Sequence, residues 1–246
     1  MSYTAQVISY STTSSSAKDL SIVLRQSTEG PELDIVYHFF EEHLRNFQTE
    51  YDLAVFVEPR LDSGFPDMVV AFWNKEISEK WSFARSLLQR SDILLMHHVN
   101  LTGELPITLL SDRMGAKKSA ATIQRLLDAG VVELTASALI KKPLNEVFAI
   151  NRLIAIEAKV RHWKKGLEQA FRNTWFASET YLLLGAIPQS QPMLADAARL
   201  GVGILDKHHS ISNPYADSKV GELPVSYASW LFNEWVWKHE LIKGAQ

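Results

Sequence analysis

The sequence predicts an α/β fold, in which a mixed central sheet is flanked by helices and interrupted by an inserted helical subdomain. Short apolar runs rich in β-branched residues alternate with stretches of helical periodicity in the first and last parts of the chain. Between residues 76 and 143 the pattern changes to helices followed by two short strands. We therefore expect a core formed by residues 1–75 and 144–246, and a separate unit formed by residues 76–143.

The composition favours a globular protein of the cytoplasm. Of the 246 residues, 46% are hydrophobic and 22% are charged, which argues against disorder. The apolar runs are shorter than the roughly 18 residues needed to cross a bilayer, and the first residues lack the pattern of a secretory signal. The chain has no cysteine, which excludes disulfides, thiolate zinc sites and a cysteine nucleophile. We expect no contact with a membrane.

A helix and a pair of strands are predicted first. The segment STEGPELDIVYHFFEEHLRNF has a proline near the first helical position and apolar residues at helical spacing. Steps of three and four place Glu32 in line with its buried stripe and Glu42 on the margin, although both acids are equally compatible with an ordinary solvated face. Residues 51–57 and 67–73 are predicted strands, and their short connection LDSGFP indicates an antiparallel hairpin.

The most informative stretch is RLIAIEAKVRHWKKGLEQA, residues 152–170. Residues 153–156 are predicted to form a buried strand, and Glu157 and Lys159, two positions apart, project to the same side. A carboxylate and an ammonium at the end of a buried strand are costly to desolvate unless they pair or take part in chemistry. A strand-end salt bridge is the simpler interpretation. The alternative is a metal-dependent nuclease, in which Glu157 holds Mg²⁺ and Lys159 stabilises phosphate charge or orients water.

The middle of the chain is predicted to be a helix-turn-helix with a wing. A short helix (107–113), a turn containing glycine, a second helix (117–129) and a β-wing (131–142) follow one another. The second helix suits recognition of a DNA major groove, and the wing suits contact with phosphates. The residues expected to contact DNA are Lys117, Lys118, Gln124, Arg125, Lys141 and Lys142. The alternative is a module for protein contacts, since winged helices serve both purposes.

Helices and strands alternate again in the last third of the chain. Residues 160–176 and 192–200 are predicted helices, residues 180–186 and 202–205 are predicted strands, and residues 225–243 form a closing helix. The net charge of −3 means that a nucleic acid would need a local basic face. The helix at 160–176 offers such a face, or else a plain solvated surface. Its basic residues are Arg161, His162, Lys164, Lys165 and Arg172.

Two acids are expected to meet if the helical segment is an insertion. Asp67 then begins one strand and Glu157 ends its neighbour, which forms a hard-oxygen site suited to Mg²⁺ or Mn²⁺. The segments GFPDMVV and IAIEAKV, with Gln169-Ala170 on the following helix, resemble the motifs of the PD-(D/E)xK nuclease superfamily. The resemblance covers about residues 31–176. The interval between its two halves is much longer than in a minimal core.

This resemblance implies a restriction-endonuclease-like core. Asp67 and Glu157 would be metal ligands, Lys159 the catalytic lysine, and Gln169 a further residue near the site. An acid from the first helix, here Glu32 or Glu42, often joins the site in this superfamily.

The function implied is that of a metal-dependent DNA endonuclease, with the winged-helix insert contacting duplex DNA. A homodimer would suit cutting of both strands. Two alternatives stay open. The chain is a non-catalytic DNA-binding regulator or adaptor on a nuclease-like scaffold, or it is a protein-contact component of a larger complex, with the tryptophan-rich closing helix as its interface.

Overall fold

The computed structural model describes residues 6–8, 20, 23–27, 29–47, 49–188 and 191–244. The chain forms two compact units. The first contains strand β1 (Gln6–Ile8) and residues 23–73 and 150–225, and the second contains residues 74–149 together with helix α9 (Tyr227–Gly244). Within the described residues, every helix is too short or too polar to cross a bilayer.

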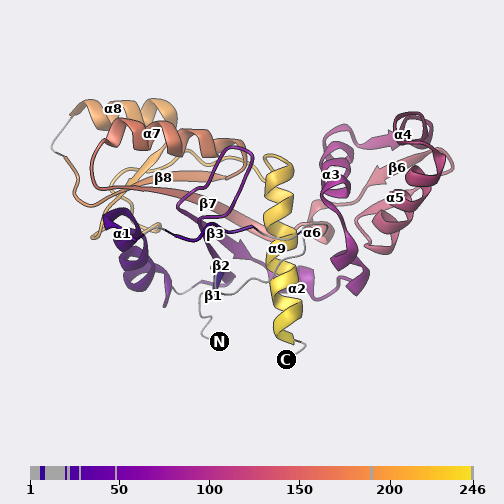
Figure 1. Cartoon of the computed structure of the whole chain (residues 1–246), viewed down its shortest axis with the longest axis horizontal. Helices are drawn as coiled ribbons and strands as arrows, with labels where there is room; N and C mark the ends of the chain where they lie inside the picture. Colours follow the sequence, from indigo (N-terminus) through magenta and orange to yellow (C-terminus); the bar gives the residue numbers. More distant parts are fainter. Residues whose placement is uncertain are drawn as a thin grey trace. The chain divides into compact units, whose positions relative to one another are not determined.

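A six-stranded mixed sheet is the centre of the first unit (Figure 1), and its strand order in the described chain is β1-β2-β3-β7-β8-β9. Strands β2 (Asp52–Val57) and β3 (Met68–Trp73) form the antiparallel hairpin that the sequence predicts. Strand β7 (Ile150–Lys159) is antiparallel to β3, whereas β8 (Glu179–Leu184) and β9 (Gly203–Leu205) continue the sheet in parallel. The predicted α/β class with a mixed sheet is therefore confirmed.

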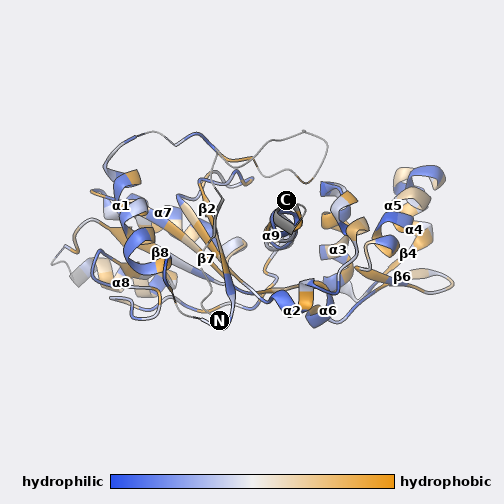
Figure 2. Cartoon of the chain, turned by 90° about the horizontal axis from the view of Figure 1, so that it is seen from below, coloured by the Kyte–Doolittle hydropathy of each residue, from blue (hydrophilic) through white to orange (hydrophobic). Residues whose placement is uncertain are grey.

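Helices cover both faces of this sheet (Figure 1). Helix α1 (Pro31–Phe39) and the π-helical turn η2 (Phe40–Leu44) pack on one face through Val36, Phe39, Phe40 and Leu44. Helices α7 (Trp163–Arg172) and α8 (Gln191–Leu200) pack on the other face. Because the strands are buried on both sides, they appear in the sequence as continuous apolar runs. In Figure 2 the strands of this unit carry much of its hydrophobic colour.

Gly166 lies where α7 packs closely against strands β7 and β8. A Cβ atom at this position would be 2.5 Å from Leu182 Cδ1 and 2.8 Å from Lys159 Cγ. Alanine normally favours a helix over glycine. Here we expect Gly166→Ala to lower the free energy of unfolding by about 1–3 kcal/mol, because the added methyl group overpacks the interface.

Urea denaturation measures this effect, with Glu168→Ala on the exposed side of the same helix as the control. The control should stay within about 0.5 kcal/mol of the wild type. A Gly166→Ala protein as stable as the wild type would show that α7 has room at this position.

The second unit contains a helix-turn-helix and a small sheet. Its helices before α9 are α2 (Lys75–Ser78), η3 (Phe83–Leu87), α3 (Arg90–Thr102), α4 (Ile107–Met114), α5 (Ala116–Asp128) and α6 (Leu144–Val147). Its strands, in sheet order, are β4 (Glu104–Pro106), β6 (Ala138–Lys141) and β5 (Val132–Leu134). Gly115 and Gly130 adopt φ of 82° and 67°, which lets the chain leave α4 and α5 without strain. The predicted succession of helix, turn, helix and wing is present.

The structure corrects the predicted domain boundary. The sequence pattern assigns residues 144–246 to the core, but α6 and α9 belong to the second unit. Buried polar contacts explain this grouping. Glu234 of α9 accepts hydrogen bonds from Arg85 Nε and Nη2 at 2.9 and 2.7 Å, and Asn233 Oδ1 accepts one from the Ala149 N–H at 2.8 Å. Hydrophobic periodicity does not reveal such a partnership.

Candidate active site

Asp67, Glu157 and Lys159 meet at one end of the β3–β7 pair. Met68 lies opposite Ile156 in the antiparallel register, so Asp67, just before β3, lies beside the end of β7. Asp67 Oδ2 accepts a hydrogen bond from the Ala158 N–H at 2.8 Å and lies 3.7 Å from Lys159 Nζ. The structure therefore brings together three residues that the sequence analysis selected from distant segments.

Glu157 is the most deeply buried member of this group, with 4% of its surface exposed. Its Oε1 accepts a hydrogen bond from Asn173 Nδ2 at 2.8 Å, whereas its Oε2 has no hydrogen-bond partner among the described residues. Burial, followed by the nearby Asp67 carboxylate, raises the pKa of Glu157 to about 8. Burial also raises the pKa of Asp67, against the opposing effects of the Ala158 N–H and Lys159. A bound cation would stabilise the ionised form of two buried carboxyl groups that lie side by side.

Lys159 contacts Glu32, which is one of the two candidate acids on the first helix. Its Nζ donates to Glu32 Oε2 at 3.1 Å and to the Ala158 carbonyl oxygen at 2.7 Å. Glu32 therefore joins the cluster as the partner of Lys159. Glu42 is exposed on η2, roughly 15 Å further along the helix axis. The structure leaves Glu42 outside the cluster because ten residues of helix carry it away from the end of β7.

A polar cavity of about 370 Å³ opens over this cluster. Its lining residues are Arg25, Glu32, Phe65, Asp67, Lys159, Arg161, His162, Lys165 and Gln169. His162 begins α7 with φ 59°, and α7, whose residues are all described, has no acid in its first turn and no side-chain cap. The first N–H groups of this helix and its basic neighbours therefore make the cavity wall attractive to anions.

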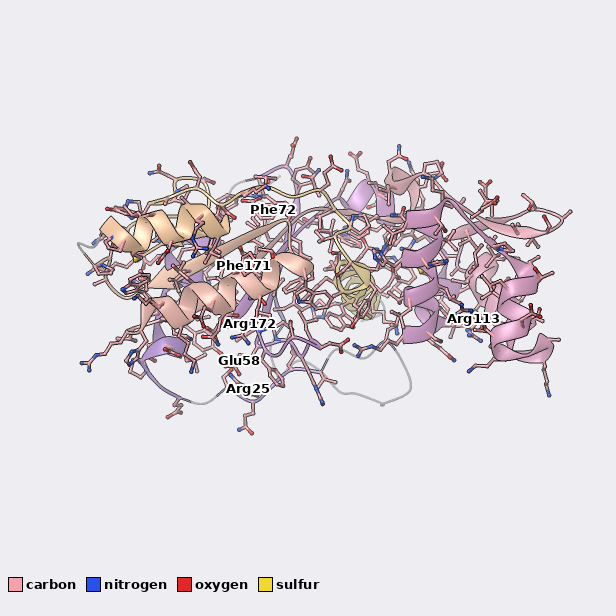
Figure 3. All side chains as sticks on the ribbon, turned by 90° about the horizontal axis from the view of Figure 1, so that it is seen from above. Arg25, Glu58, Phe72, Arg113, Phe171 and Arg172 are labelled. Carbon is pink, nitrogen blue, oxygen red and sulfur yellow. The ribbon has the colours of Figure 1, made fainter. Side chains whose placement is uncertain are left out.

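An ion pair that the sequence does not predict lies beside the acids. Arg25 Nε and Nη2 donate to the two oxygens of Glu58 at 2.8 and 2.6 Å, and Arg25 stacks over Phe65 with its guanidinium carbon 5.0 Å from the ring centroid. Figure 3 labels Arg25 and Glu58, which lie together. The Glu58 N–H donates to the Asp67 carbonyl oxygen at 3.1 Å, so this pair supports the segment that carries Asp67. The sequence marks Glu58 only as the end of a strand.

The residues present fit a hard divalent cation. Asp67 and Glu157 offer two carboxylates, and Glu157 Oε2 is a buried oxygen in need of a partner. No group of three or more His, Asp or Glu side chains able to hold a metal is found in the described part of the chain. Mg²⁺ often takes only one or two carboxylates and completes its shell with water and phosphate oxygens. Asp67 and Glu157 are therefore the residues that could hold Mg²⁺ or Mn²⁺.

Glu157 leads to a prediction about pH. Its pKa rises from 4.5 to about 8 on folding, so the folded state keeps a proton that the unfolded state loses. The corresponding stability is fully present below pH 4.5 and is lost as the pH rises through 8. We expect the free energy of unfolding of the metal-free protein to fall by the order of 2 kcal/mol between about pH 6 and pH 8.5.

Urea unfolding in EDTA at the two pH values measures this change. Glu157→Gln cannot ionise, so this variant should lose most of the pH dependence. A wild-type stability that stays level or rises over the same interval contradicts the prediction.

The residues predicted to contact DNA fall into different environments. Lys117 and Lys118 are exposed on the first turn of α5. Arg125 is bound through Nε and Nη2 to the buried carboxylate of Asp92, both at 2.9 Å, and thereby joins α5 to α3. The ion pair gives Arg125 a structural role inside the unit, and its contact with DNA stays a prediction. Gln124 donates to Asp128 at 2.7 Å on the surface of α5.

The wing places its two lysines away from its turn. Its turn lies at residues 135–137, and Lys141 and Lys142 lie at the opposite end of β6, where the chain continues into α6. Lys142 Nζ is 3.4 Å from Glu146 Oε2. The exposed residues 133–137, all of them described, include an acid and no cation. The two lysines are therefore poorly placed to bind phosphates through the wing turn.

No family model, no curated protein and no solved structure matches this chain. The fold and the site define its class directly. The chain is an α/β protein with a mixed sheet flanked by helices. Asp67 and Lys159, beside the buried Glu157, line a polar cavity at the end of the central β3–β7 pair. A second unit with helix-turn-helix order accompanies this fold.

Proposed function

We propose that this protein is a metal-dependent nuclease with a restriction-endonuclease-like core, and that it hydrolyses phosphodiester bonds of DNA. The observation that carries the proposal is the convergence of Asp67, Glu157 and Lys159 at the ends of adjacent strands. The PD-(D/E)xK resemblance implies this arrangement, and the unpartnered oxygen of Glu157 adds a local demand for a cation.

The contacts of Lys159 argue against the simpler interpretation of the E-x-K motif. A strand-end salt bridge would join Glu157 and Lys159. Among the described residues, Lys159 instead pairs with Glu32 and Asp67, and Glu157 pairs with the neutral Asn173. Lys159 therefore leaves the carboxyl group of Glu157 without an ion-pair partner, which supports a role for Glu157 in binding a cation.

Each residue of the cluster has a place in the proposed reaction. A bound Mg²⁺ or Mn²⁺ supplies a water of lowered pKa and neutralises phosphate charge. Asp67 and Glu157 would hold that ion. Lys159 Nζ, kept in place by Glu32, would donate to the scissile phosphate or orient the attacking water. Gln169 lines the same cavity, and its buried Oε1 has no partner among the described residues.

The basic side of the cavity supports a nucleic-acid substrate. Arg161 and Lys165 lie on its wall next to the first turn of α7. Phosphates beside the one that is cleaved would bind to these cations and to the free N–H groups of the helix. The acidic net charge of the chain is compatible with this, because the attraction is local.

The test is incubation of the purified chain with supercoiled plasmid, linear duplex and single-stranded DNA, each with Mg²⁺, Mn²⁺ or EDTA. We expect cleavage with the metals and none with EDTA. Absence of cleavage in every metal-containing reaction would contradict the proposal. Size-exclusion chromatography with light scattering shows whether the chain forms the homodimer that double-strand cutting favours.

A second candidate function is that of a non-catalytic DNA-binding regulator or adaptor. The exposed lysines at the start of α5, in a helix-turn-helix arrangement, favour it. This function predicts binding of duplex DNA that weakens steeply with salt, and no cleavage with any divalent metal.

Changing Lys117 and Lys118 together to alanine tests contact through this helix. We expect a roughly tenfold loss of affinity for duplex DNA and a salt slope reduced by about two, because two phosphate contacts are removed. Fluorescence anisotropy with a short duplex in EDTA measures both quantities. The matched control changes Lys141 and Lys142 to alanine, which should have little effect. Equal affinities for wild type and the Lys117/Lys118 variant would favour a protein-contact module.

A further inference from the structure

Asn173 is a buried polar residue that belongs to none of the motifs in the sequence. It begins the short 3₁₀ helix η4 (Asn173–Trp175) directly after α7, and 4% of its surface is exposed. Its carbonyl oxygen accepts hydrogen bonds from the N–H groups of Phe176 and Ala177 at 3.2 and 3.1 Å. The backbone of Asn173 is therefore held firmly, and its side chain points to Glu157, where Nδ2 donates to Oε1 at 2.8 Å.

In each of the two acids, Asp67 and Glu157, one carboxylate oxygen accepts a hydrogen bond. Glu157 Oε1 is bound by Asn173, and Asp67 Oδ2 is bound by the Ala158 N–H. Glu157 Oε2 is left without a partner among the described residues. A donor on one oxygen fixes the rotation of a carboxylate, and so determines the direction in which the other oxygen points.

The neutral amide of Asn173 suits this task better than a cation. An ammonium or guanidinium on Glu157 would cancel the charge that a metal ion requires. An amide donor stabilises the ionised carboxylate without neutralising it. Asn173 therefore holds Glu157 in one orientation, and its hydrogen bond lowers the pKa of Glu157 against the larger effect of burial, without cancelling the charge that the carboxylate would offer to a metal ion.

We infer that Asn173 is a positioning residue for metal binding, which holds Glu157 so that the two acids share one Mg²⁺ or Mn²⁺ ion. This inference rests on the proposed function, because it assumes that Asp67 and Glu157 are the metal ligands. It adds a residue that acts through Glu157. Supporting hydrogen bonds of this kind typically contribute 10- to 100-fold to metal affinity.

The experiment measures Mn²⁺ binding to the full chain by calorimetry and by electron paramagnetic resonance, without DNA. Asn173→Leu keeps the approximate size of the side chain and removes its donor. We expect Mn²⁺ affinity to fall at least about tenfold. Asn173→Ser, whose hydroxyl is one atom nearer the backbone than the amide donor and so falls short of Glu157 Oε1, serves if the leucine variant does not fold, and it should also bind Mn²⁺ more weakly than wild type.

Ser178→Ala is the matched control. Ser178 is equally buried at 4% exposure, and its hydroxyl bonds to the backbone of Leu153, away from the acids. This control should lose stability and keep its Mn²⁺ affinity. A purely structural Asn173 would behave in the same way.

Three outcomes separate the inference from the proposed function. Wild-type affinity in a folded Asn173 variant overturns the inference alone, provided that Glu157→Ala loses Mn²⁺ binding. Failure of the wild type to bind Mn²⁺, or undiminished binding by Glu157→Ala, overturns the proposed metal site and the inference with it. A loss shared by Glu157→Ala and the Asn173 variants, but not by Ser178→Ala, supports both.

Discussion

Glu157→Ala is expected to abolish metal-dependent DNA cleavage and to leave DNA binding largely intact. The substitution removes one of the two carboxylates proposed to hold the cation, and with it Glu157 Oε2, a buried oxygen that lacks a partner among the described residues. Removal of a group that acts on developing charge commonly costs 10²–10³-fold in rate, and we expect at least roughly this loss. Plasmid cleavage in Mg²⁺ or Mn²⁺ measures the activity, and anisotropy in EDTA measures binding.

Glu42→Ala is the control for this substitution. Glu42 is the other first-helix acid that the superfamily resemblance offers as a metal ligand. It is exposed and is not among the described residues that line the cavity. Its removal should leave cleavage unchanged. Glu157→Gln, which keeps the size of the side chain, should be as inactive as Glu157→Ala. Undiminished cleavage by Glu157→Ala would remove the nuclease proposal.

Arg85→Met is expected to lower the free energy of unfolding by about 3–5 kcal/mol, because it leaves a buried carboxylate without its partner. Arg85 is fully buried and donates to both oxygens of Glu234 and, at 2.6 Å, to the Val147 carbonyl oxygen. Its guanidinium carbon also lies 3.4 Å from the centroid of Trp81. A loss of this size is a large part of the stability of most domains. Urea denaturation followed by circular dichroism measures it.

Two further variants show whether the lost partner is the cause. Changing Glu234 to methionine together with Arg85 removes both charges, so the double variant should recover most of the stability. Lys142→Met breaks the exposed pair with Glu146 and should cost less than about 1 kcal/mol. A single Arg85→Met variant within 1 kcal/mol of wild type would show that the buried pair contributes little.

Much of the fold could be predicted because its cause is local. Strands β2, β3 and β7 are apolar runs whose burial on both faces appears directly in the sequence. Gly130 ends α5 through its positive φ, as a glycine after a periodic segment predicts. The shared face of Glu157 and Lys159 follows from the two-residue period of a strand.

The features that the sequence left open or did not reveal have a different physical origin, since they concern partners that lie far apart in the sequence. Helical spacing places both Glu32 and Glu42 near a buried stripe, but only the packing of α1 beside the end of β7 brings Glu32 to Lys159. The exposed face of α5 is predictable, whereas the use of Arg125 by Asp92 depends on how α3 packs against it. Asn173 stands at no characteristic spacing from the two motifs. Its contact with Glu157 arises only when α7 folds back over the sheet.

The sequence by itself determined the α/β class, the approximate positions of strands β2, β3, β7, β8 and β9, and the presence of two acids and a lysine in segments that a sheet could unite. Local propensity and period are sufficient for these, because each depends on neighbours within a few residues. Only the tertiary structure decided which donors hold those acids, which acid accompanies Lys159, and which unit contains the last helix. Burial creates those distinctions, because a polar group removed from water must find its partner wherever the packed chain provides one.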